Sequence, residues 1–177
     1  MNIFKKNLLS LFLFFVTLPI LSNINPPDSI KQKLVQEVKS YIMDKFPKTH
    51  QSIPKSIVNH GLNHNIDIIF IMAQTQIETQ FGNSGIGRPT SKKSLFGVMS
   101  RRYNTYDHAI EDYISILKRN YLQNGKTTQH LINNYITNNG KRYAANMNYE
   151  KELRKTYQNI HNSTKITTLQ KEFYRYK

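Results

Sequence analysis

Apolar residues recur at helical spacing along most of this chain, which predicts a mainly α protein. The first such segment is predicted to form a helix over 28–46, capped at its start by Asp28 or Ser29. A shorter helix over 54–60 is expected to stop at Gly61, because glycine readily adopts the left-handed conformation at a helix end. Both segments carry one apolar face and one polar face, as helices on the outside of a domain do.

Three further amphipathic segments follow in the second half of the chain. We expect Asp107 to cap one helix and Thr127 to begin another, which Gly140 ends. A third helix is expected to follow the loop 140–148, with its apolar face on Leu153, Tyr157 and Ile160. Residues 163–177 are basic and only weakly periodic, and we expect them to form a peripheral C-terminal tail.

The segment 66–81 differs from the others because apolar residues surround the helix nearly completely. A helix that is apolar on all sides belongs in the centre of a fold. The next segment, 82–106, has three glycines and a proline among its first eight residues, which excludes a regular helix there. It is predicted to form a long functional loop or a small β lobe. The most buried helix therefore leads directly into an irregular lobe.

The first 22 residues have the organisation of a secretory signal peptide. Two lysines precede an apolar stretch over 8–18, which Pro19 ends and which is shorter than a membrane span of about 20 residues. Ser22 suits the cleavage position, whereas Ile20 is bulky for the position that precedes it by two residues. We predict a protein that is secreted or exported to the periplasm or cell envelope. An uncleaved N-terminal anchor is the alternative.

Composition limits the chemistry of this chain. Its 177 residues suffice for one domain with a hydrophobic core, expected over 23–162. There is no cysteine, so disulfides, thiolate metal sites and a cysteine nucleophile are excluded. The net charge of +14 favours anionic surroundings such as nucleic acid, anionic lipid or bacterial wall polymer. A codon supply rich in lysine explains the excess equally well, so charge alone names no partner.

Glu78 is the acidic residue whose position indicates chemistry. It lies one turn before the end of the predicted central helix, with Ile77 and Phe81 beside it and Gln74 one turn back on the same face. Partial burial and the negative end of a helix dipole both disfavour the charged form of a carboxyl at such a place. A carboxyl that stays protonated near neutral pH is what a general acid for glycosidic cleavage requires. The alternative is a structural role in which the carboxylate binds N–H groups of the loop 82–87.

Four segments of the chain form an ordered set: AQTQIETQFG, SLFGV, YNTYDHAIEDYISIL and NGKRYAANMNYEKELRKTY. In this order they resemble the glucosaminidase-type lysozyme domains of glycoside hydrolase family 73, which includes bacterial autolysins, flagellar-rod-associated muramidases and Bax-type proteins. The resemblance covers roughly 66–160. It implies a lysozyme-like fold, a central helix that ends at the catalytic Glu, and hydrolysis of peptidoglycan without a cofactor.

Residue by residue, the resemblance implies that Glu78 is the catalytic acid and that Tyr143 positions the sugar or a reacting water. Ser94 begins the segment that matches the family's Asn-Leu-Phe-Gly motif and replaces its Asn, so we assign no ligand role to Ser94. Core packing is the alternative role for Tyr143 and for the other aromatic residues considered. The residues assigned to substrate binding are Gln74, Phe96, Tyr103 and Tyr106.

The irregular segment supplies a second carboxylate in some family members, but here no Asp or Glu lies between Glu78 and Asp107. Two-carboxylate glycosidases hold their acids about 5–10 Å apart. Glu111 and Asp112 are the nearest candidates by sequence, and both fit a first helical turn that faces solvent. We therefore expect a single-carboxylate mechanism, in which water or a group of the substrate itself traps the sugar cation. The latter route is that of lytic transglycosylases.

Other kinds of site are not indicated. His60 and His64 lack a carboxylate that would complete a zinc site, and the glycines of 82–87 follow a helix and lack a phosphate-binding lysine. The sequence thus predicts a monomeric, exported peptidoglycan hydrolase of the N-acetylglucosaminidase type, with no metal and no cofactor. Its expected partners are glycan strands and anionic wall polymers, not nucleic acid. The alternatives are a catalytically impaired wall-binding module of the same fold and a lytic transglycosylase.

Overall fold

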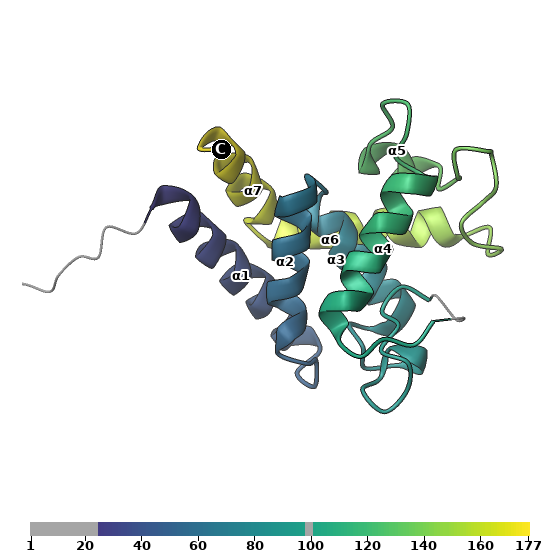
Figure 1. The fold of residues 1–177 in the computed structure, drawn as a ribbon, viewed down its shortest axis with the longest axis horizontal. Coiled ribbons are helices and arrows are strands. Elements are labelled where there is room, and N and C mark those ends of the chain that lie inside the picture. The colour runs from purple at the N-terminus through teal and green to yellow at the C-terminus, as the bar shows by residue number, and fades with distance from the viewer. Residues whose placement is uncertain (1–24, 98–100) are drawn as a thin grey trace, which may run out of the picture.

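The computed structural model describes residues 25–97 and 101–177, and this part of the chain is mainly helical, as the sequence predicts. It contains seven α-helices, one short 3-10 helix and no β-strand (Figure 1). The predicted signal segment, 1–22, lies outside the described residues. The elements are α1 (Pro26–Lys45), α2 (Ser52–His64), α3 (Ile68–Thr79), η1 (Gly85–Gly87), α4 (Tyr106–Asn120), α5 (Thr128–Asn133), α6 (Tyr149–Ser163) and α7 (Ile166–Arg175).

Helix α1 begins slightly earlier than its apolar pattern predicts. Pro26 and Pro27 occupy its first positions, where a missing N–H leaves no hydrogen bond unmade. The cap residue is therefore Asn25, and the prediction that Asp28 or Ser29 caps this helix is wrong. The buried face is the predicted one, formed by Ile30, Leu34, Val38, Tyr41 and Ile42.

Helix α2 does not stop at Gly61, as the sequence predicts, but continues to His64. Asn65 takes the left-handed conformation instead, with a φ of 54°. Gly61 serves close packing, because a Cβ atom there would lie 2.7 Å from Cγ1 of Ile68 in α3. This glycine therefore marks the place where α2 meets the next helix rather than the place where α2 ends.

Helix α3 is the central helix that the sequence predicts, and it packs against α2, α6 and α7. All of its residues from Ile68 to Thr75 are buried. Asp67 caps its start by accepting a hydrogen bond from the backbone N–H of Ile69. At its other end, Gln80 and Phe81 both have positive φ, 51° and 54°, and turn the chain into the lobe that follows.

The lobe over 82–105 is irregular, and its described part contains turns and η1 but none of the strands of a β lobe. Thr79, near the end of α3, holds it in place. The Thr79 hydroxyl donates to the carbonyl of Leu95 at 3.0 Å and accepts from the N–H of Gly82 at 3.2 Å. Both ends of the lobe segment 82–95 are therefore tied to one side chain of the central helix.

Helix α4 starts at Tyr106 and is capped by Thr105, whose hydroxyl accepts a hydrogen bond from the backbone N–H of His108. The predicted cap, Asp107, lies inside the first turn, where its carboxylate interacts favourably with the helix dipole. The side chain of Asp107 also pairs with Nε2 of His60 in α2 at 3.1 Å.

Helix α5 is shorter than predicted. Thr127 caps it, as expected for its first residue, but α5 ends at Asn133 rather than at Gly140. The chain then reverses direction, and Ile136 pairs with Arg142 in an antiparallel bridge. Because of this reversal, Tyr135 points into the core and is fully buried.

Residues 166–175 form α7, which packs against α1 and α3, in place of the expected peripheral tail. Ile166 is fully buried. The side chain of Gln170 accepts from the N–H of Ile68 at 3.1 Å and donates to the carbonyl of Ile66 at 2.9 Å. Helix α7 thus supplies hydrogen-bond partners for the start of the central helix and belongs to the domain.

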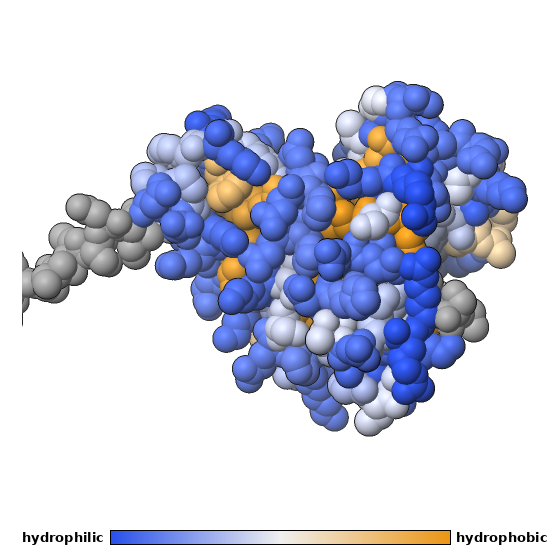
Figure 2. Space-filling model, in the orientation of Figure 1, coloured by the Kyte–Doolittle hydropathy of each residue, from blue (hydrophilic) through white to orange (hydrophobic). Residues whose placement is uncertain are grey.

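The face of the molecule shown in Figure 2 is mostly hydrophilic, with apolar residues visible in a few small areas among the polar ones. Among residues 25–97 and 101–177, no helix combines the length and the apolar character that crossing a membrane requires.

Candidate active site

Two tyrosine hydroxyls meet at one oxygen of Glu78. Tyr149 donates a hydrogen bond to Oε1 of Glu78 at 2.7 Å, and Tyr143 donates to the same atom at 3.1 Å. Tyr149 is the first residue of α6, and Tyr143 lies in the loop before it. The start of α6 therefore lies against the end of α3, and the carboxyl of Glu78 is half-buried between them.

The two hydroxyls are not equivalent donors. Tyr143 also lies 3.0 Å from the backbone carbonyl of Phe96, which is a second acceptor for its single proton. Tyr149 makes the shorter bond to Glu78 and is the stronger donor. Tyr143 thus links the carboxyl to the lobe, and Tyr149 links it to α6.

Both hydroxyls keep their protons over the neutral pH range. Burial raises the pKa of Tyr149 and that of Tyr143, and a negative charge on the neighbouring Glu78 raises both further. They are therefore permanent hydrogen-bond donors to the carboxyl.

The second oxygen of Glu78, Oε2, lies beside the main chain of Gly97. A Cβ atom at position 97 would be 2.6 Å from Oε2, and the φ of Gly97 is +71°. A residue with a side chain meets both obstacles at this position. The SLFG segment therefore contacts the candidate acid directly through Gly97 and, by way of Tyr143, through the carbonyl of Phe96.

A buried chain of hydrogen bonds continues from Tyr149 into the core. Nε2 of Gln74 donates to the Tyr149 oxygen at 2.8 Å, and the Tyr135 hydroxyl donates to Oε1 of Gln74 at 2.9 Å. The hydroxyls of Tyr135 and Tyr113 lie 3.1 Å apart. Gln74 has 0% exposure and lies behind the carboxyl, so the prediction that it contacts substrate is wrong.

The three aromatic residues assigned to sugar contact are also buried: Phe96 is 3% exposed, Tyr103 6% and Tyr106 3%. The Phe96 ring stacks on Tyr113 with a centroid distance of 3.7 Å. Tyr103 donates to Oδ2 of Asp112 at 2.6 Å, and Tyr106 donates to the carbonyl of Gly87 at 2.9 Å. At these exposures none offers a free ring face to a sugar, so their positions fit packing of the lobe, the alternative that the sequence left open.

Asp112, one of the two acids considered as a second carboxylate, is already bound by residues of the lobe. It accepts hydrogen bonds from Tyr103 and from Arg101, with which it forms an ion pair. Burial raises the pKa of Asp112, but these hydrogen bonds and the charge of Arg101 outweigh burial and leave it below its usual value. Glu111 is exposed on α4. The carboxylate of Asp112 therefore anchors the lobe to α4.

The structural role considered for Glu78, binding N–H groups of the loop 82–87, falls to its neighbour Thr79. The N–H of Gly82 donates to the Thr79 hydroxyl, whereas Tyr143 and Tyr149 are the described residues that hydrogen-bond to Glu78. The sequence thus identified Glu78 and Tyr143 as neighbours but missed Tyr149 and Gly97 as parts of the site. Tyr149 ends the RYAANMNY segment, so the motif that indicated Tyr143 contained it.

No metal site is apparent in the part of the chain that the structure describes, where no three His, Asp or Glu side chains gather closely enough. The rings of His60 and His64 stack with a centroid distance of 6.1 Å, and Asp107 is the acid that pairs with His60.

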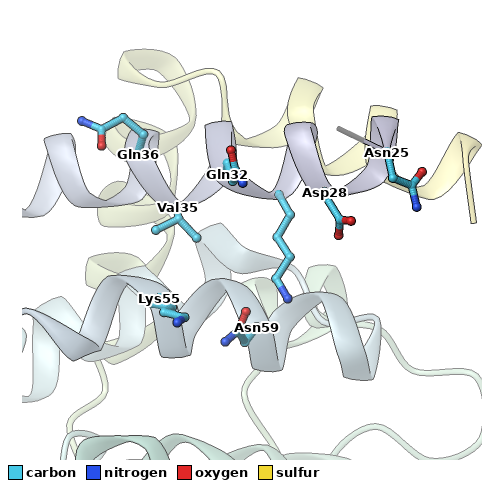
Figure 3. A pocket seen from close by; sticks show the side chains of 8 residues that line it. Asn25, Asp28, Gln32, Val35, Gln36, Lys55 and Asn59 are labelled. Atoms are coloured by element: carbon cyan, nitrogen blue, oxygen red, sulfur yellow. The ribbon is translucent and has the colours of Figure 1, made fainter. Parts of the chain in front are cut away.

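Two cavities bear on where a ligand could lie. One of about 650 Å³ lies between α1 and α2, where polar side chains of the two helices face each other (Figure 3). It is lined by residues remote in sequence from Glu78 and its two tyrosine donors, including Asp28, Lys31, Lys55 and Asn59. Another, of about 390 Å³, lies between α3 and α6 and is bordered by Ile77 and Gln80, on either side of Glu78 in the chain.

Comparisons with protein-family models, with curated proteins and with solved structures find no match for this chain. The geometry around Glu78 therefore carries the functional interpretation.

Proposed function

We propose that this chain is an exported peptidoglycan hydrolase that cleaves β-1,4 glycan bonds of the N-acetylglucosaminidase type, with Glu78 as the general acid. The observation that supports it is the asymmetry of the Glu78 carboxyl. Oε1 accepts hydrogen bonds from Tyr149 and Tyr143, which leaves Oε2 as the oxygen that carries the proton. A half-buried carboxyl held in this way has one oxygen for orientation and one for chemistry.

In this mechanism the proton on Oε2 passes to the glycosidic oxygen as the glycosidic bond breaks. The departing sugar leaves as an alcohol, and the carboxylate that remains is stabilised by the two tyrosine hydroxyls. Water, or a hydroxyl of the substrate itself, then forms the new bond to the sugar cation, and the proton that it releases returns to the Glu78 carboxylate. The net charge of +14 would hold the protein near anionic wall polymer, an attraction that weakens with salt.

The occupation of Asp112 by Arg101 and Tyr103 favours two alternatives. A lytic transglycosylase needs no second carboxylate, because a group of the substrate forms the new bond. A catalytically impaired module that only binds wall glycan needs neither acid.

Mass spectrometry of the soluble products from purified peptidoglycan tests these functions, with wild type beside Glu78→Gln. Gln keeps an oxygen that accepts from both tyrosines but has no acidic proton, so we expect a rate lower by about 10²–10⁴ with little change in the melting curve. Glu111→Gln, on the exposed face of α4, is the matched control and should retain activity.

Each outcome has a distinct meaning. Products with reducing-end N-acetylglucosamine that disappear in Glu78→Gln support the proposal. Reducing-end N-acetylmuramic acid would mean a muramidase, and 1,6-anhydromuramyl ends would mean a lytic transglycosylase. No fragments from wild type, with wall binding intact, would replace the hydrolase by a binding module.

A further inference from the structure

The buried hydrogen bonds behind Glu78 form a continuous chain, here called the tyrosine–glutamine chain. It runs from Tyr113 through Tyr135, Gln74 and Tyr149 to Oε1 of Glu78, with donor–acceptor distances of 3.1, 2.9, 2.8 and 2.7 Å. Its inner members are buried, so water does not compete for these bonds.

The direction of the chain follows from Gln74, its one member whose donor and acceptor are separate atoms. Oε1 of Gln74 accepts the proton of Tyr135, so Tyr113 must donate to Tyr135. Nε2 of Gln74 donates to the oxygen of Tyr149. The Tyr149 proton therefore points away from Gln74, toward Glu78.

We propose that the tyrosine–glutamine chain sets the catalytic proton of Glu78 on Oε2, with Tyr149 and Gln74 as positioning residues. The reason is that Oε1 receives the Tyr149 proton at 2.7 Å and has no room for one of its own on that side. This proposal deepens the proposed function, on which the catalytic role of the proton rests. The direction of the chain itself is a property of the fold.

The opposite direction would make Glu78 useless as an acid. If the Gln74 amide were rotated by a half-turn, its oxygen would accept the hydrogen bond from Tyr149. The Tyr149 oxygen would then face Oε1 without a proton between them. A proton on Oε1 would then lie between the two oxygens, in a hydrogen bond to Tyr149 instead of facing a glycosidic bond. Tyr135 opposes this rotation, because its proton needs the Gln74 oxygen as acceptor.

The aromatic cluster holds the chain in this arrangement. The Tyr135 ring stacks on the Tyr143 ring with a centroid distance of 4.3 Å, and the Phe70 ring packs edge-on against the Tyr135 ring with a centroid distance of 5.8 Å. Tyr121 also packs edge-on against Tyr135 and Tyr143, but its hydroxyl makes no hydrogen bond to the described residues. Tyr121 therefore shares the packing of the chain without sharing its hydrogen bonds.

The test is a pH titration of the Glu78 carboxyl by ¹³C NMR of the full domain, which needs no enzyme activity. Tyr143 and Tyr149, the titratable groups that contact Glu78 in the described residues, have a pKa raised by burial and stay neutral in the acid range. Tyr149→Phe removes a donor to the carboxylate and should move the Glu78 midpoint up by about one pH unit.

Tyr135→Phe is the decisive variant, because the lost hydroxyl bonds to Gln74 and not to Glu78. Freed from Tyr135, the amide can rotate and draw the Tyr149 proton away, so the midpoint should move up in the same direction by less. Tyr121→Phe, the matched control, should leave the midpoint unchanged. If Tyr149→Phe does not fold, the comparison of Tyr135→Phe with Tyr121→Phe decides by itself.

The outcomes test the tyrosine–glutamine chain and the proposed function independently. A midpoint in Tyr135→Phe that equals that of Tyr121→Phe would overturn the directional chain, and so would an unmoved midpoint in Tyr149→Phe. In an active enzyme, the alkaline limb of the rate profile on peptidoglycan should follow the same shifts. If titration confirms the tyrosine–glutamine chain but wild type releases no fragments, the proposed hydrolysis is wrong and the direction of the hydrogen bonds still holds.

Discussion

The Oε2 atom of Glu78 lies so close to Gly97 that a Cβ atom at position 97 would be only 2.6 Å away from it. The end of the central helix and the lobe therefore fit together at the one carboxyl oxygen that no tyrosine hydroxyl occupies. The lobe thereby fixes the position of the oxygen from which the proposed mechanism transfers a proton.

Gly97→Ala should displace the Glu78 carboxyl. The added methyl group clashes with Oε2, and a displacement of about 1 Å at a reacting group lowers rates by about a hundredfold. Measured release of soluble fragments from peptidoglycan should fall accordingly. Gly125→Ala is the matched control, because Gly125 has a similar φ of +76° with open space around it. Equal losses in both variants would mean that backbone strain, not the clash at Glu78, is the cause.

Thr79→Val should destabilise the lobe while preserving side-chain volume. The buried N–H of Gly82 and carbonyl of Leu95 lose their partner, which costs about 1–3 kcal/mol of unfolding free energy for each unsatisfied group. Urea unfolding gives this value. Thr75→Val, one turn earlier, is the comparison, because the Thr75 hydroxyl bonds only to the carbonyl of Ile71 in its own helix. Similar losses for both would contradict the anchoring role of Thr79.

Gln170→Leu should lower stability because it leaves the N–H of Ile68 and the carbonyl of Ile66 buried without a partner. The expected loss is about 1–3 kcal/mol for each unsatisfied group, as measured by thermal or urea unfolding. Thr168→Leu adds an apolar side chain at an exposed position of the same helix and should change stability little. A peripheral tail would show no difference between the two variants.

Asp112→Asn should make stability less dependent on pH. The pKa of Asp112 is lowered in the folded protein from its ordinary 3.8, so its charge contributes stability above that value, and this contribution is lost as pH falls through the lower folded value. Wild type should therefore melt higher than Asp112→Asn near neutral pH, and the two should converge in strong acid. Glu111→Gln, on the exposed face of α4, should follow wild type throughout. A difference that persists undiminished in acid would exclude the charge of Asp112 as its source.

Periodicity predicted most helices because the spacing of apolar residues along a helix is a local property of the sequence. Helix ends were less well predicted, since they depend on neighbours from other parts of the chain. Gly61 looked like a helix terminator, but its missing side chain makes room for Ile68. The C-terminal segment looked peripheral, yet the partners of Gln170 are backbone groups more than a hundred positions earlier in the chain, and no local signal reveals them.

By itself the sequence determined the helical class, the buried central helix, the irregular segment after it, and Glu78 as the acid to consider. These are local properties of composition and spacing. Only the tertiary structure decided what surrounds that acid, because its hydroxyl donors come from positions 65 and 71 residues away. It also showed that Gln74 is buried behind the carboxyl instead of being exposed to a ligand. The sequence of α3 alone does not reveal this, because the other helices decide which of its side chains they cover.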